Sequence, residues 1–291
     1  MMQVTRFKFL TALVLLLTAF ISNASSVYKV SKGDKFLYLG GTIHILTADD
    51  YPLASPYQEA FEQAKEVYFE TDIAALNSPE FQQQTLPVIL QPQGQTLNAQ
   101  LSPEVQTQLQ TYLDSRGIPA AQIQALRPAG AMLVLTITEF QLRGFTQPGV
   151  DDFFFNKATE NKKHIGWLES VESQLDLIKG FNDMDPDALI KYTLEDVSKG
   201  DEMILSLHEA WRKGDLSGLF AAGMDSWIDE YPKVYQNIMV DRNNAWYPQI
   251  VNMLKDDDVE FVLVGALHLA GEDGLIHLLE QDGYKVEKFT P

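Results

Sequence analysis

Apolar positions form short runs near both ends of the chain, and these runs predict strands. Residues 38–44 read Tyr-Leu-Gly-Gly-Thr-Ile-His, and residues 261–268 read Phe-Val-Leu-Val-Gly-Ala-Leu-His. Each run predicts a buried strand that stops at a glycine and leaves a histidine, His44 or His268, a few residues beyond its end. In open α/β sheets, ligand sites form at the carboxyl edge of the strands. The repeated Gly-x-x-His pattern therefore predicts that the fold brings these two histidines together.

Each Gly-x-x-His lies within a strand–helix–strand pattern. In the first half, a hairpin over 28–39 contains the first strand, a helix over 55–65 begins at Ser-Pro, and a short strand ends at Glu70. In the second half, a strand over 259–264, a helix and a final strand over 285–289 repeat this order. Strands of such βαβ units pair in parallel. The fold class is therefore predicted to be α/β, with two βαβ halves that form one sheet.

The stretch between the two halves is mostly helical in pattern. Helices are predicted over 102–117, 129–142 and 151–161, then a strand over 165–168 that ends at Glu169, then further helices. The apolar segment over 129–142 is read as a buried core helix, because it is shorter than the roughly 20 residues of a membrane span. No linker divides the chain. Residues 25–291 are predicted to form one domain with a large helical middle region.

The first 24 residues read as a secretory signal peptide. Arg6 and Lys8 precede an apolar run over 9–21, and the small residues Ser-Asn-Ala at 22–24 are typical of a signal peptidase site. We expect cleavage after this triplet, with cleavage after Ser26 as the alternative and an uncleaved anchor as a further one. The mature protein is then expected to be periplasmic or secreted, without integral membrane association.

The composition narrows the possible partners. The sequence carries a formal net charge of −18, and loss of Arg6 and Lys8 would leave about −20. Such an acidic surface repels nucleic acid and anionic lipid headgroups, so neither is an expected partner. The chain has no cysteine, which excludes a thiol nucleophile and thiolate metal ligands. Any metal would therefore lie among histidine and carboxylate side chains.

The residues that could carry chemistry lie close to predicted strand ends or on helices near them: His44, Glu70, Asp151, Glu169, Arg242 and His268. Imidazole and carboxylate together form either a divalent-metal site or a general acid–base pair. A nearby arginine suits a substrate carboxylate, a developing oxyanion or a glutamate that needs orienting. Each candidate also has a structural alternative, such as a solvated glutamate at a strand end or an ordinary ion pair for Arg242.

Several of these segments together resemble the TraB/PrgY/GumN family, which is related to the Tiki proteases and, more distantly, to erythromycin esterase and ChaN-like proteins. The resemblance spans nearly the whole chain after residue 24. It rests on 38–44, the strand that ends at Glu70, 149–151, 168–170, 241–243 and 264–269. It implies that the two motif histidines, a glutamate and an arginine share one cleft.

The resemblance implies a hydrolase of amide, peptide or ester bonds that acts on a peptide or small-molecule substrate. In the preferred mechanism, His44 and His268 hold a divalent metal ion (manganese, cobalt or zinc) together with Glu70, which is the third ligand or the base. Arg242 stabilises the oxyanion, and Glu169 belongs to the same catalytic set. One alternative is a metal-free hydrolase with His44 as general base. The other is a non-catalytic protein that captures a ligand in the same cleft.

Overall fold

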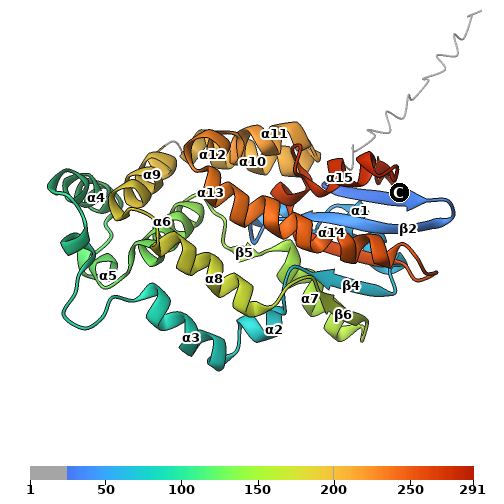
Figure 1. Cartoon of the computed structure of the whole chain (residues 1–291), viewed down its shortest axis with the longest axis horizontal. Helices are drawn as coiled ribbons and strands as arrows, with labels where there is room; N and C mark the ends of the chain where they lie inside the picture. Colours follow the sequence, from blue (N-terminus) through green and yellow to red (C-terminus); the bar gives the residue numbers. More distant parts are fainter. Residues whose placement is uncertain (1–24, 199) are drawn as a thin grey trace, which may run out of the picture.

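A six-stranded sheet lies toward one end of the molecule, and a helical region extends from it to the other end (Figure 1). The structure is a computed structural model that describes residues 25–198 and 200–291, so the predicted signal peptide lies outside the described residues. No helix in the described ranges is long and apolar enough to cross a membrane.

The strand order across the sheet is β6-β4-β7-β2-β1-β8. The strands of this sheet are β1 (Val27–Lys32), β2 (Lys35–Thr42), β4 (Glu66–Phe69), β6 (His164–Trp167), β7 (Glu260–Gly265) and β8 (Lys285–Lys288). Neighbours from β6 to β2 pair in parallel, whereas β1 is antiparallel to both β2 and β8. The predicted hairpin is confirmed, and it turns at Gly33, whose φ of 68° suits a residue without a Cβ.

The two predicted βαβ units are present, but direct pairing of the strands within each unit is wrong. β7 lies between β2 and β4, while β2 and β1 lie between β7 and β8. The physical reason is burial, because β7 is covered along nearly its whole length and such a strand belongs in the sheet interior. β2 also runs past its glycines to Thr42, which lies opposite Gly265 of β7. The interleaving therefore makes the two Gly-x-x-His segments immediate neighbours.

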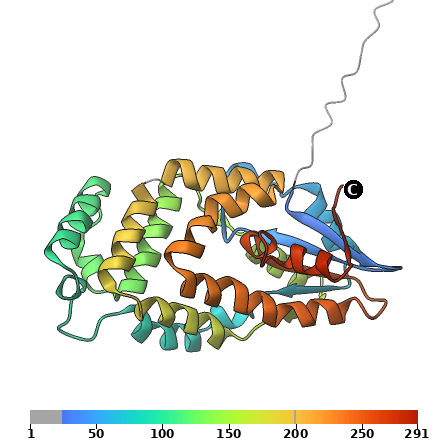
Figure 2. The ribbon, with the colours of Figure 1, turned by 45° about the horizontal axis from the view of Figure 1, so that its top comes forward.

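Helices cover both faces of the sheet and form two separate apolar cores. On one face, α1 (Ser55–Gln63), α7 (Val150–Glu160) and α10 (Gly200–Lys213) pack around Phe154 and Phe261. On the other face lie α14 (Asp241–Met253) and α15 (Leu275–Gln281), which can be followed in Figure 2. Trp246 of α14 is fully buried in this second core.

The helical region has its own core of leucine and isoleucine side chains, including Leu109, Leu135 and Ile190. Its longer helices are α3 (Pro79–Ile89), α4 (Pro103–Arg116), α6 (Pro128–Leu142), α8 (Val171–Asn182) and α9 (Pro186–Ser198). Shorter helices are α2 (Ile73–Leu76), α5 (Ala120–Gln124), α11 (Leu216–Gly223), α12 (Asp225–Glu230) and α13 (Pro232–Tyr235). The prediction of an α/β fold with a large helical middle region is confirmed.

Candidate active site

His44 is held beside Asp151 by a short two-stranded ladder. After His44, β3 (Ile45–Leu46) pairs with β5 (Gln147–Pro148), and the chain then enters α7, whose first turn carries Asp151. A Cβ on Gly149 would lie 2.5 Å from the carbonyl carbon of His44, so only glycine permits this close approach. The result is a hydrogen bond of 2.9 Å between His44 Nδ1 and Asp151 Oδ2.

The His44–Asp151 pair favours a charged, oriented imidazole. Asp151 raises the pKa of His44, although burial of the ring nitrogen works against protonation. Burial also opposes ionisation of Asp151, but the charge of His44 and its hydrogen bond outweigh it and lower the pKa of Asp151. The His44 side chain is 70% exposed. Among the described residues, none hydrogen-bonds to Nε2 of His44, so this nitrogen is available to a substrate, a water or a metal.

His268 is fixed in one tautomer by Asn243. It lies on the short helix η4 (Ala266–Leu269) directly after β7, and its Nδ1 is 2.7 Å from Asn243 Oδ1. The Asn243 amide nitrogen donates to the carbonyl oxygens of His268 and Asp273 at 3.3 and 2.8 Å. Because this nitrogen is used, the amide oxygen faces Nδ1, which must carry the hydrogen and leaves a lone pair on Nε2. Burial lowers the pKa of His268 to about 3, so the ring is neutral.

Arg242 joins the parts of the site through its guanidinium group. Its Nη2 donates to Glu70 Oε2 at 2.6 Å and to Glu169 Oε1 at 2.8 Å, and its Nε donates to Glu169 Oε2 at 3.1 Å. Its Nη1 lies 3.0 Å from His268 Nε2. The guanidinium also lies over the ring of Trp246, 4.4 Å from the ring centre. The Arg242 guanidinium is thus held in position by two carboxylates, an aromatic face and an imidazole.

The two glutamates serve Arg242 in different ways. Glu70 follows β4, and its Oε1 accepts a hydrogen bond of 2.7 Å from the backbone nitrogen of Gly265. Burial opposes its ionisation, but the charge of Arg242, together with smaller contributions from the two histidines and the Gly265 hydrogen bond, outweighs burial and lowers the pKa of Glu70 to about 2. Glu169 follows β6 and accepts further hydrogen bonds from Gln174 and from Trp246 Nε1. Glu169 is therefore a positioning residue for Arg242.

Four of the residues expected at the site, His44, Glu70, Arg242 and His268, line one pocket of about 290 Å³. Glu169 lies behind Arg242 and does not line it. The sequence reasoning gave no role to Asn243, although this residue directly follows Arg242 in the Asp-Arg-Asn segment. The position of Asn243 next to Arg242 on one helix could have indicated its role at the site.

The donor types at the site, imidazole and carboxylate, are ones that divalent metals bind. Histidine ligands usually have their second ring nitrogen held by a carboxylate or another acceptor, and both His44 and His268 have Nδ1 held in this way. Within the described ranges, no three His, Asp or Glu side chains lie close enough to form a cage. Arg242 also hydrogen-bonds His268 Nε2, so a metal could use that nitrogen only after this bond is released.

A family comparison agrees with this architecture. The model of the TraB/PrgY/gumN family matches residues 26–288, which is nearly all of the described chain. The chain belongs to this family. Its membership confirms the resemblance that was predicted from the sequence segments around His44 and His268.

The curated relatives of this family member are distant. Metalloprotease TIKI1 of Danio rerio is 25% identical over 91% of this chain and 63% of its own length. Metalloprotease TIKI1 of Homo sapiens is 24% identical over 91% of this chain and 62% of its own. Uncharacterized protein YbaP of Escherichia coli is 23% identical over 85% of this chain and 89% of its own. The chain thus spans under two-thirds of the Tiki proteins, and no solved structure matches it.

Proposed function

We propose that this protein is a hydrolase of peptide, amide or ester bonds that uses a divalent metal ion held by His44 and His268. The observation that carries the proposal is the pairing of two imidazoles, each held at Nδ1 by a side-chain acceptor, in one pocket with a fixed guanidinium. The name metalloprotease, which the Tiki relatives carry, supports both the reaction class and the metal.

Manganese, cobalt or zinc would supply Lewis acidity, which makes water acidic enough to lose a proton near neutral pH. Glu70 would be the third ligand or the acceptor of a proton from water. Arg242 is the cation that faces negative charge as it develops on the substrate oxygen, where fixed donors lower the barrier most. Asp151 and Asn243 orient the two imidazoles, and Glu169 holds the plane of the guanidinium.

A second candidate keeps the same pocket without a metal, and the hydrogen bond from Arg242 to His268 Nε2 favours it. Neutral His44 would then remove a proton from water through Nε2 while the water oxygen forms a bond to the substrate carbonyl carbon. Arg242 stabilises the oxyanion. The imidazolium next gives its proton to the leaving nitrogen or oxygen as that bond breaks. Because Asp151 raises the pKa of His44, this activity should increase toward alkaline pH.

The deciding experiment compares peptide and ester hydrolysis by protein proved metal-free by elemental analysis with hydrolysis after addition of manganese, cobalt or zinc. A requirement for metal, lost in His44→Ala and His268→Ala, supports the proposal. Full metal-free activity that His44→Ala abolishes supports the second candidate. His164→Ala is the control, because its 62% exposed side chain lies outside the pocket. No turnover under any condition would overturn hydrolysis and leave a binding protein.

We also infer that the chain is exported to the periplasm or secreted. Arg6, Lys8 and the apolar run at 9–21 support this inference. N-terminal sequencing of exported material is expected to begin at Ser25 or Val27. An intact Met1 on a cytoplasmic product would contradict it.

A further inference from the structure

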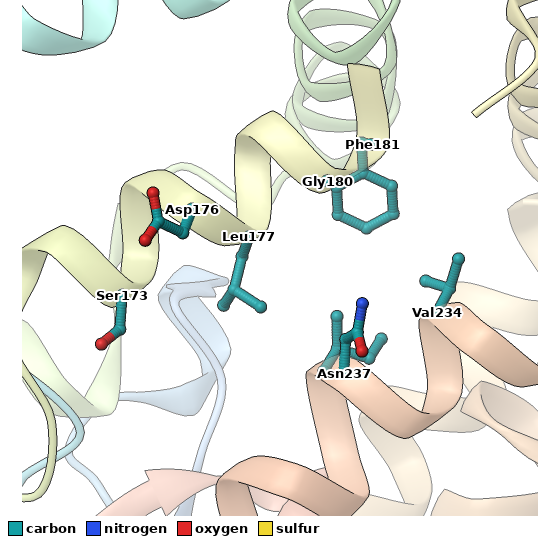
Figure 3. Close-up of a pocket in the computed structure, with 8 residues that line it drawn as sticks. Ser173, Asp176, Leu177, Gly180, Phe181, Val234 and Asn237 are labelled. Atoms are coloured by element: carbon teal, nitrogen blue, oxygen red, sulfur yellow. The ribbon is translucent and has the colours of Figure 1, made fainter. Parts of the chain in front are cut away.

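Two more pockets continue from the candidate active site. The first, of about 330 Å³, lies between α8 and the helix that precedes Arg242 (Figure 3). Figure 3 shows Leu177 and Phe181 pointing from α8 toward the helix that carries Val234 and Asn237. Ile238 lines both this pocket and the active-site pocket. The middle pocket therefore adjoins the active-site pocket at Ile238 and is bounded by two helices.

The second pocket, of about 230 Å³, is mainly apolar and lies beyond the first. Phe181 and Val234 line both of them. Its wall contains Tyr192, whose ring packs edge to face against Trp227 and Tyr231 at centroid distances of 5.4 and 4.8 Å. All three rings are only partly buried. A set of partly exposed aromatic rings around a hollow is suited to hold an apolar side chain.

Two rows of side chains connect the three pockets. Along α8, Gln174 lines the active-site pocket, Leu177 the middle pocket and Phe181 both the middle and the aromatic pocket. At the helical rise of 1.5 Å per residue, Gln174 and Phe181 lie roughly 10 Å apart along the axis. On α8, the lining of the middle pocket runs from Ser173 to Phe181, so it lies beside Gln174 of the active-site pocket and reaches the aromatic pocket at Phe181.

The opposite wall has the same order in the reverse chain direction. α13 continues through the π-helical turn η3 (Gln236–Val240) into α14. Arg242 lines the active-site pocket. Ile238 lines both the active-site and the middle pocket, and Val234 lines both the middle and the aromatic pocket. Arg242 and Val234 lie roughly 12 Å apart along the axis by the same rise. π-Turns inside helices are frequent at functional sites.

We propose that the three pockets form one groove for an extended peptide, with an apolar side chain in the aromatic pocket. This inference rests on the proposed hydrolase function, because the groove begins at His44 and Arg242. An extended chain advances about 3.3 Å per residue. A separation of roughly 10–12 Å therefore places the apolar side chain three or four residues from the bond that is cut.

The charge of the groove selects among peptides. The charged side chains that line the two outer pockets are Asp176 and Asp196, and both are acidic. Asp176 also pairs with the exposed Lys179, whose Nζ lies 2.7 Å from Asp176 Oδ1. The whole chain also has a net charge of −18. A cationic peptide is therefore favoured over a neutral one, and an acidic peptide is repelled.

Gly180 offers a direct way to fill the groove. It is exposed, it lines the middle pocket between Leu177 and Phe181, and a Cβ built on it meets no atom within 4 Å. Gly180→Leu therefore places a side chain in open space and improves helix propensity, so the variant should fold. Lys179→Arg is the matched control, because it adds side-chain bulk at a neighbouring position that is 52% exposed and does not line the pocket, and it keeps the positive charge that pairs with Asp176. Trp227→Ala tests the aromatic pocket independently.

The test uses capped octapeptides that contain alanine, serine, one lysine and one phenylalanine. The phenylalanine is moved by one position from each peptide to the next. Binding is measured by fluorescence anisotropy and the cut bond by mass spectrometry, with a capped dipeptide as the short substrate. We expect cleavage three or four residues from phenylalanine. Gly180→Leu and Trp227→Ala should weaken octapeptide binding at least tenfold, without changing dipeptide hydrolysis, and Lys179→Arg should match the native chain.

The outcomes separate the groove from the hydrolase. Cleavage that ignores the phenylalanine position, with Gly180→Leu equal to the native chain, would overturn the groove and leave hydrolysis standing. Binding that depends on phenylalanine and is lost in Gly180→Leu, without any cleavage, would support the groove and count against hydrolysis. Absence of both binding and cleavage would overturn the groove.

Discussion

Arg242 is the counter-ion of two buried carboxylates, so its loss should destabilise the fold as well as stop catalysis. Arg242→Met keeps the apolar stem and removes the guanidinium. The Glu70 and Glu169 side chains are only 15% and 10% exposed, so water cannot replace the lost partner well. Removing one member of a buried ion pair costs about 3–5 kcal/mol because the remaining charge is uncompensated.

The pKa of Glu70 gives a second measure of this cost. Burial raises it, yet Arg242 and, less strongly, His268 and His44 lower it from 4.5 to about 2. This difference corresponds to about 3 kcal/mol of stability. Because the folded pKa is lowered, the stabilisation is complete above pH 4.5 and is lost as pH falls toward 2. The difference between Arg242→Met and the native chain should therefore shrink over that range.

Urea unfolding in a metal chelator measures this effect, because bound metal would add its own stabilisation. At pH 7 we expect Arg242→Met to lose about 3–4 kcal/mol, and Arg242→Met/Glu169→Gln to lose less. Lys179→Met removes an exposed ion pair and should change the free energy of unfolding by less than about 0.5 kcal/mol. If Arg242→Met stays within about 1 kcal/mol of the native chain with an unchanged m-value, Arg242 is not the counter-ion.

Three further predictions concern the histidines. Metal uptake at pH 7 should release about one proton, because Asp151 raises the pKa of His44 whereas His268, with a pKa of about 3, is already neutral. Calorimetry in two buffers of different ionisation enthalpy counts these protons, and a count of two or none would contradict the assignment. Asn243→Leu should weaken metal binding roughly 10–100-fold by releasing the His268 tautomer, which metal titration measures. Gly149→Ala should cost about 1–3 kcal/mol and lower activity, because its Cβ meets the His44 backbone; unchanged unfolding and activity would refute this.

Sequence reasoning succeeded where the signal is local. Proline and serine at helix starts, and glycine at helix ends, placed helices such as α4 within a residue or two of their observed bounds. The His44 and His268 motifs each lie at a strand end, so their shared context could be read without tertiary information. The strand order could not be read in this way, because a strand pattern carries no record of its neighbours. Burial of β7 decided that order.

The side-chain contacts within the site were harder to predict from the sequence. Asp151 and Glu169 were both recognised as candidates, but their roles depend on which side chain each one meets after folding. Asp151 meets His44 through the β3–β5 ladder, which consists of two-residue strands too short to predict. Similarly, Leu177 and Phe181 line a pocket from α8, and the sequence does not distinguish an apolar helix face that packs from one that lines a groove.

The interleaved strand order has a consequence for the timing of activity during synthesis. His44 and His268 become neighbours only when β2 and β7 pair, and most of the chain separates these strands in sequence. Such long-range parallel pairing forms late and slowly. A nascent chain that ends before β7 lacks His268, which the proposed metal site requires. The proposed metal site is therefore completed only after β7 has been synthesised and has paired with β2.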